Sequence, residues 1–78
     1  MALKAYVLIN LGSKNITEIL AALRAAEGVE SAKAVTGPYD IVVTVEAKDI
    51  DAMGDLVTKN ILSIDGIERT LTCIVLKL

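Results

Sequence analysis

The sequence has no histidine, phenylalanine or tryptophan, and it contains a single cysteine, a single proline and two tyrosines. One cysteine cannot close a disulfide within the chain, and without histidine the usual zinc ligand sets are excluded. The eight basic residues are scattered, and aromatic rings are scarce. Neither a basic stripe for phosphates nor a stacking platform for bases is present, so direct nucleic-acid binding is not expected.

The chain is nevertheless rich in apolar residues. It has 78 residues, 54% of them hydrophobic, with a mean hydropathy of +0.59 and a net charge of −2. A domain of this size buries only about 60–65% of its unfolded surface. The excess apolar surface therefore predicts an interface. No run reaches the ~18 apolar residues of a membrane span and no signal peptide is visible, so we expect a cytoplasmic protein. Cys73 lies in an apolar run and is expected to be a small buried hydrophobe.

Apolar periodicity predicts four strands and two helices. The strands are expected at residues 4–10, 30–36, 41–47 and 67–78, with a turn at residues 11–14. The first helix is expected to start at an N-cap, Asn15, with Glu18 completing a capping box, and to stop near Gly28. Asp49 is the expected cap of the second. The predicted buried stripes are Ile16, Ile19, Leu20 and Leu23 in the first helix, and Ile50, Met53, Leu56, Val57 and Ile61 in the second.

This order is β-α-β-β-α-β, and it repeats internally as Gly28-Val29-Glu30 and Gly66-Ile67-Glu68. Two βαβ units with right-handed crossovers give an α+β, ferredoxin-like fold, a four-stranded antiparallel sheet with both helices on one face. In three of the four strands the alternate residues are also apolar, whereas an exposed face would be polar. We therefore expect two sheets to pack face to face in a homodimer.

The stretch from Val35 to Val43 joins two apolar runs through a turn, Gly37-Pro38-Tyr39-Asp40, called the central turn below. Glycine and proline set the backbone of such a turn. A turn does not need the aromatic ring and the carboxylate that follow. Their presence at its exit raises the possibility of a site, although a purely structural connection is the simplest interpretation of the stretch alone.

Three segments together resemble a known family. They are Val35–Ile41, Ala47-Lys48-Asp49, and the run from Ile64 to Leu76, which includes Gly66-Ile67-Glu68-Arg69-Thr70-Leu71-Thr72. The pattern resembles the effector domain of the Lrp/AsnC regulators, also called RAM for regulation of amino-acid metabolism. The likeness covers essentially the whole chain as one domain, residues 1–78. Its motifs are Gly-x-Tyr-Asp at the turn and Gly-Ile/Val-x-x-Thr-x-Thr at the last strand.

Typical members of that family begin with a helix-turn-helix, which is missing here, so the chain is similar to the stand-alone RAM proteins. The resemblance implies homodimers that assemble further, commonly into rings of four dimers, with an amino acid bound where dimers meet. The interface shared with full-length Lrp/AsnC-type regulators motivates the hypothesis of mixed assemblies with them, and no cofactor or metal is expected.

The resemblance also implies a set of ligand-binding residues. The central turn would hold the α-amino and α-carboxylate groups, two threonines and an isoleucine of the last strand would complete the site, and two apolar residues would line the side-chain pocket. These residues are Gly37, Pro38, Tyr39, Asp40, Thr70, Thr72, Ile74, Ala34 and Ile50. An aspartate accepts from an ammonium and a threonine hydroxyl donates to a carboxylate.

Each assignment has a simpler counterpart. Thr70 and Thr72 are good strand formers, Asp40 could close an Asx-type turn or pair with a lysine, and Tyr39 also suits an interface. Catalysis is unsupported, because the sequence has no histidine and no close carboxylate pair. A metal carrier would need thiolates in the loop at residues 10–14, where there are none.

An ACT-type amino-acid-sensing module shares the element order and the ligand class, but usually pairs its sheets side by side. A ligand-free interaction protein is a further alternative. We therefore predict a homo-oligomeric effector-binding domain that is not an enzyme. Its effector is a small molecule, expected to be an amino acid, and binding of that effector is coupled to oligomeric assembly.

Overall fold

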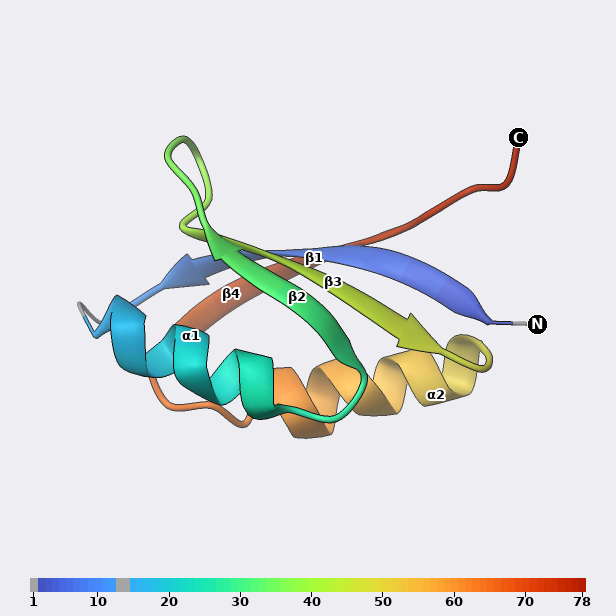
Figure 1. The fold of residues 1–78 in the computed structure, drawn as a ribbon, viewed down its shortest axis with the longest axis horizontal. Coiled ribbons are helices and arrows are strands. Elements are labelled where there is room, and N and C mark those ends of the chain that lie inside the picture. Colours follow the sequence, from blue (N-terminus) through green and yellow to red (C-terminus); the bar gives the residue numbers. More distant parts are fainter. Residues whose placement is uncertain (1, 13–14) are drawn as a thin grey trace.

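The computed structural model describes residues 2–12 and 15–78. Its elements are β1 (Leu3–Leu11), α1 (Ile16–Ala25), β2 (Val29–Ala34), β3 (Ile41–Ala47), α2 (Ile50–Asp55), the π-helical segment η1 (Leu56–Ile61) and β4 (Ile67–Ile74). The strands pair antiparallel in the order β2-β3-β1-β4, and the helices cover one face of the sheet (Figure 1). The predicted ferredoxin-like fold is confirmed. The turn predicted at residues 11–14 includes Ser13 and Lys14, which lie outside the described residues.

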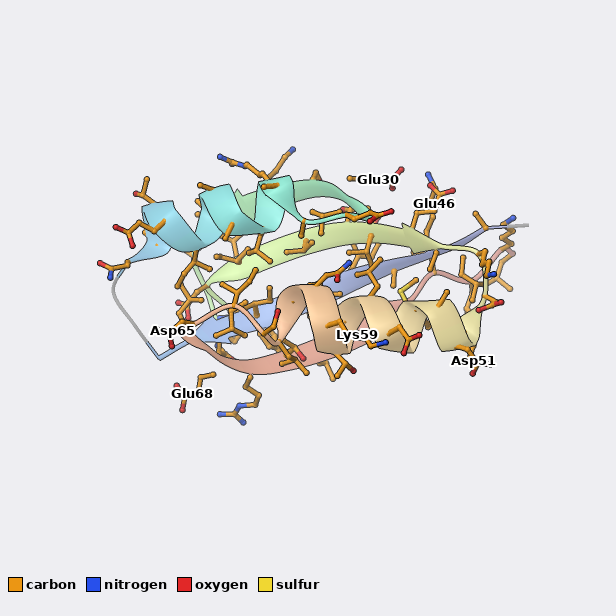
Figure 2. All side chains as sticks on the ribbon, turned by 90° about the horizontal axis from the view of Figure 1, so that it is seen from below. Glu30, Glu46, Asp51, Lys59, Asp65 and Glu68 are labelled. Carbon is orange, nitrogen blue, oxygen red and sulfur yellow. The ribbon has the colours of Figure 1, made fainter. Side chains whose placement is uncertain are left out.

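The core lies between the helices and the sheet. The alternate residues of β1 and β3 point into it, because successive strand residues face opposite sides. Figure 2, seen from the helix side, shows α1 and the α2–η1 helix side by side over the sheet. The buried residues are Ala5, Val7, Ile9, Ile19, Leu23, Ala32, Ile41, Val43, Val45, Met53, Leu56 and Ile61.

The helix starts follow the sequence in part. Asp49 caps α2 as predicted, since its Oδ1 accepts the Ala52 N–H at 2.8 Å. Asn15 precedes α1, but its side chain makes no capping hydrogen bond. Ile50 was wrongly placed in the buried stripe, because its side chain is 62% exposed. It is the first residue of α2, which begins three residues after the end of β3 at Ala47.

The second helix widens along its length. The predicted single helix becomes a π-helix at Leu56, where the Leu62 N–H donates to the Val57 carbonyl five residues earlier at 2.8 Å. The widened turn docks on the corner between α1 and β2. There the Asn60 side chain donates to the Glu27 carbonyl at 2.9 Å, and Leu56 packs on Gly28.

Gly28→Ala should strongly destabilise the fold. Gly28 has φ +87, and an added Cβ would lie 2.2 Å from Cδ1 of the buried Leu56. Left-handed strain and overpacking together should cost about 2–4 kcal/mol, lowering Tm by roughly 10 °C or more. Gly54→Ala is the matched control, because a Cβ there meets nothing within 4 Å. That helix substitution should raise stability by about 0.5–1 kcal/mol. Equal melting temperatures for the two variants would contradict the packing described.

Two strands end earlier than predicted. β2 stops at Ala34, not residue 36, because its last strand pair is with Ile41, the first residue of β3, and the chain then enters the turn. β4 stops at Ile74, not residue 78. One further bond, from the Val75 N–H to the Lys4 carbonyl at 2.8 Å, precedes the point where the tail leaves the sheet. The tail and the central turn rise at opposite ends of the sheet, both on the side away from the helices (Figure 1).

The sheet face turned away from the helices has an apolar centre, as the alternation predicted, with charged and polar residues around it. Tyr6 and Leu71 are 48% and 50% exposed on it. Cys73 is also exposed there, so its predicted burial is wrong for the single chain, because none of the described residues covers this side of β4. We call this the open face, formed by Tyr6, Leu8, Val42, Leu71 and Cys73. The chain exposes 5098 Å², against about 4,600 Å² for a typical folded monomer of its mass.

Candidate functional site

The central turn is fastened to the end of β1 as well as to the strands that it joins. The Asp40 N–H donates to the Ile9 carbonyl and the Val35 N–H donates to the Asp40 carbonyl, both at 2.9 Å. The Asn10 side-chain amide donates to the Pro38 carbonyl at 2.8 Å. The backbone of the turn is therefore set by contacts with β1 that are remote in sequence.

Asp40 is half-buried, and its carboxylate has a defined partner in the chain. Oδ2 accepts the Leu11 N–H at 2.8 Å. In the described part of the chain this is the one hydrogen bond to the carboxylate, and neither a lysine nor an Asx-type turn supplies it. A carboxylate has about four acceptor positions, so Asp40 can hold Leu11 and also receive a ligand ammonium.

Gly37 gives the turn its conformational freedom and its open side. Its φ is +132, a region that side chains rarely adopt, and a Cβ built there meets nothing within 4 Å. Pro38 is exposed and Tyr39 half-buried. The turn thus presents an accessible stretch of backbone, which suits the close approach of another molecule.

Three other candidates follow one another along β4. Thr70, Thr72 and Ile74 pair with Ile9, Val7 and Ala5 respectively. They share the helix-side face with those core residues, yet Thr70 is half-buried and the other two are exposed. β4 is an edge strand, and the helices pack mainly over β2 and β3. The three side chains therefore form an uncovered strip.

The nine candidates do not form one pocket within a single chain. Ile9 pairs with Ile41 on one side and Thr70 on the other, which puts Thr70 about 10 Å from the start of β3. Ala34 pairs with Ile41, so it also lies at the turn end of the sheet. Ile50 and Ile74 lie toward the opposite end, where β3 and β4 finish. One chain alone therefore does not form a site that uses all nine.

An apolar hollow of about 480 Å³ also lies at that opposite end. Of the nine candidates it contains Ile74 alone. Its lining residues are Ala2, Leu3, Lys4, Glu46, Ile74, Val75, Leu76 and Lys77.

Sequence reasoning missed Asn10 and Leu11, the residues of β1 that hold the turn. Asn10 stands at the end of an otherwise apolar strand, and that isolated polar residue was an available signal. Its partner was not readable, because 28 residues separate Asn10 from Pro38. The β1–β4 register also shifts between Asn10 and Leu11.

The remaining charged groups do not gather in one place. Among the labelled side chains, Glu30 and Glu46 lie near each other, Asp65 and Glu68 lie toward the opposite end, and Asp51 lies apart from both pairs (Figure 2). Within residues 2–12 and 15–78, no group of three or more His, Cys, Asp or Glu side chains is arranged to hold a metal ion. Nor does that part of the chain contain a helix of the length and apolarity needed to cross a membrane.

Comparison with known sequences gives a regulatory context. The chain is 38% identical over 61 residues to a homocitrate synthase of Sulfurisphaera tokodaii, covering 78% of this chain and 13% of the synthase. It is 37% identical over 76 residues to an uncharacterised HTH-type transcriptional regulator of Pyrococcus horikoshii, covering 97% of this chain and 51% of the regulator. The chain thus spans about half of that regulator and a small part of the synthase.

Solved structures agree in fold. Escherichia coli AsnC superposes with a TM-score of 0.91 at 34% identity, covering 97% of this chain and 52% of that one. A protein of Thermus thermophilus gives 0.89 at 36% identity, covering 97% and 95%. A transcriptional regulator of Neisseria meningitidis, solved as an L-Met complex, gives 0.85 at 27% identity, covering 96% and 50%.

The sheet order and the single helical layer define a ferredoxin-like α+β domain. A family model of the Lrp/AsnC ligand binding domain matches residues 4–78. The chain belongs to this family, whose matching relatives include transcriptional regulators. The family resemblance seen in the sequence is confirmed.

Proposed function

We propose that the chain binds an amino acid at the central turn and conveys occupancy through its assembly state. The observation that supports this most directly is the family match over residues 4–78, joined to a turn whose backbone is open at Gly37 and whose carboxylate has acceptor capacity left. The Neisseria meningitidis regulator with the same fold was solved with L-Met. On this proposal the protein is cytoplasmic and is not an enzyme.

The assembly proposed is a homodimer through the open face. A specific dimer buries about 800 Å² on each partner. The open face is apolar, and the central turn and the C-terminal tail rise at its two ends, as side walls for a second copy (Figure 1). Neighbouring dimers then bring the strip Thr70–Thr72–Ile74 of one copy near the turn of another, in an octamer or a related ring. An effector shifts that equilibrium only if it binds the larger assembly better than the separate dimers.

A thermal-shift screen of the purified chain against the twenty L-amino acids tests this proposal. Ligand at about 100 times its Kd adds about 2.7 kcal/mol, on the order of 10 °C for a domain this small. The N-acetyl derivative of each hit and, for a chiral hit, its D-enantiomer are the controls, because neither can place an ammonium on Asp40 in the same way. A shift with the L-amino acid alone is expected, whereas no shift with any of the twenty would reject an amino-acid effector.

The partners have two candidate sources. The first candidate partner is a full-length HTH-type regulator, because the chain matches about half the length of such a regulator. Mixed oligomers with it would alter its DNA binding. Similarity to a segment of a homocitrate synthase favours a second, an effector module acting on a biosynthetic enzyme. Size-exclusion chromatography of the chain mixed with each partner separates them. Co-elution with the regulator alone supports transcriptional control, and co-elution with the synthase alone supports enzyme control.

A further inference from the structure

The first step concerns the end of the β1–β3 ladder. The last backbone pair is Ile9 with Ile41, but β1 continues to Leu11. Residues two apart in a strand direct their N–H and C=O groups to the same side, so the Leu11 N–H faces the side where β3 has not yet begun. The Asp40 carboxylate accepts it at 2.8 Å. A side chain of the turn thus replaces the missing strand partner.

Asn10 makes the second contact with the turn. Its side chain leaves β1 on the opposite face from its neighbours Ile9 and Leu11, and it donates to the Pro38 carbonyl at 2.8 Å. Consecutive residues of β1 therefore bind the turn twice, once through a side chain and once through the backbone. We call this pair of bonds, Asn10 to Pro38 and Leu11 to Asp40, the latch.

The latch coincides with an irregularity on the other side of β1. Asn10 pairs with Arg69, whereas Leu11 pairs with Ile67, so Glu68 is an extra residue in β4, a β-bulge. Immediately beyond it, the Gly12 N–H donates to the Gly66 carbonyl at 2.8 Å. The same two residues of β1 hold the turn on one side and define the start of β4 on the other.

We propose that Asn10 is a positioning residue for the central turn, and that the latch makes the turn and the start of β4 a single cooperative unit. Where a ligand is concerned, this rests on the function proposed above. An ammonium accepted by the free oxygen of Asp40 would fix the carboxylate, steady Leu11 and the bulge, and so set the position of Thr70 just beyond it. Occupancy of the turn then reaches the β4 edge through β1.

Amide hydrogen exchange of the full chain, followed by NMR without any ligand, tests the latch. Asn10→Asp keeps the side-chain shape but removes the donor to Pro38. Asn60→Asp is the matched control, since it deletes an equivalent bond to the Glu27 carbonyl elsewhere. The reporter is the Gly12 N–H, bonded to Gly66 rather than to the turn. The Val75 N–H, bonded to Lys4 at the other end of the same ladder, is the internal reference.

In Asn10→Asp, exchange should quicken about tenfold or more at Val35 and Asp40, whose N–H groups are bonded in the turn, at Gly12 and at residues 67–69, with Val75 unchanged. Asn60→Asp should leave all of these at wild-type rates. Acceleration confined to Val35 and Asp40, or the same pattern in Asn60→Asp, would overturn the proposal. If Asn10→Asp does not fold, amide exchange of the wild-type chain in low denaturant tests the proposal instead. The protection factors of Leu11 and Gly12 should then fall together, staying within about threefold of each other. Different denaturant dependences of the two amides would show that the turn and the start of β4 are not one cooperative unit.

The ligand-free design keeps this result apart from the amino-acid screen. A failed screen leaves the latch measurable, and a failed latch leaves a positive screen intact.

Discussion

Leu71→Glu is expected to convert the proposed homodimer into a monomer. Leu71 is 50% exposed in the single chain and lies opposite Leu8 on the open face, on the edge strand β4. In a face-to-face dimer the substitution loses a buried leucine, about 2 kcal/mol, and places a carboxylate from each copy in an apolar interface, a penalty of several kcal/mol. The dimer dissociation constant should rise at least about 1,000-fold. Sedimentation velocity should then show a species of 8.3 kDa.

The monomer so produced should also be less stable. A chain of this size is only marginally stable alone, and its folding free energy is linked to dimerisation. Leu62→Glu is the matched control, because Leu62 is 45% exposed but lies at the end of η1. That variant should remain a dimer with a near wild-type Tm. A dimeric Leu71→Glu would exclude the open face as the interface, and a monomeric Leu62→Glu would transfer the interface to the helical side.

The sequence predicted the fold because each element has a strong local signal. The buried stripe of α1 and the alternation of β3 are periodic, and the cap at Asp49 is a local hydrogen bond. The errors are positions where the neighbouring element decides. Ile50 has the spacing of a core residue but is exposed at the first position of α2, and Cys73 has an apolar neighbourhood but is exposed on an edge strand. The π-helical widening at Leu56 depends on contacts with the corner at Gly28.

The sequence predicted which residues belong to the candidate site, but not how they are arranged. The Gly-Pro pair predicted a turn, and the structure has that turn, with a positive φ at Gly37. What could not be predicted is the latch, because hydrogen bonds from Asn10 and Leu11 span 28 and 29 residues and depend on where β3 begins. A site shared between copies is likewise invisible in one chain. The role of Asp40 therefore needs a substitution that separates its bond to Leu11 from its charge.

Asp40→Asn should abolish most ligand binding while leaving the fold intact. The amide oxygen of asparagine can accept the Leu11 N–H as the Asp40 Oδ2 does, so the end of the β1–β3 ladder is preserved. The negative charge is lost, and the amide nitrogen takes the place of an oxygen that would face the ammonium. Loss of a charge-assisted bond together with this unfavourable contact should cost about 2–4 kcal/mol, a fall in affinity of roughly 30- to 1,000-fold. Isothermal titration with the amino acid that gives the largest thermal shift measures it.

Asp40→Ala completes the comparison, because it removes the acceptor as well as the charge. The half-buried Leu11 N–H then has no partner from the turn, which should destabilise the ligand-free fold by about 1–3 kcal/mol. The two variants should therefore bind ligand equally poorly but melt differently, with Asp40→Asn near wild type and Asp40→Ala roughly 5–15 °C lower. Wild-type affinity in Asp40→Asn would show that Asp40 only fastens the turn to β1, and the ammonium would then have to be bound elsewhere. If Asp40→Ala instead melts at the same temperature as wild type, Asp40 does not stabilise the fold, and its carboxylate serves only to bind the ligand.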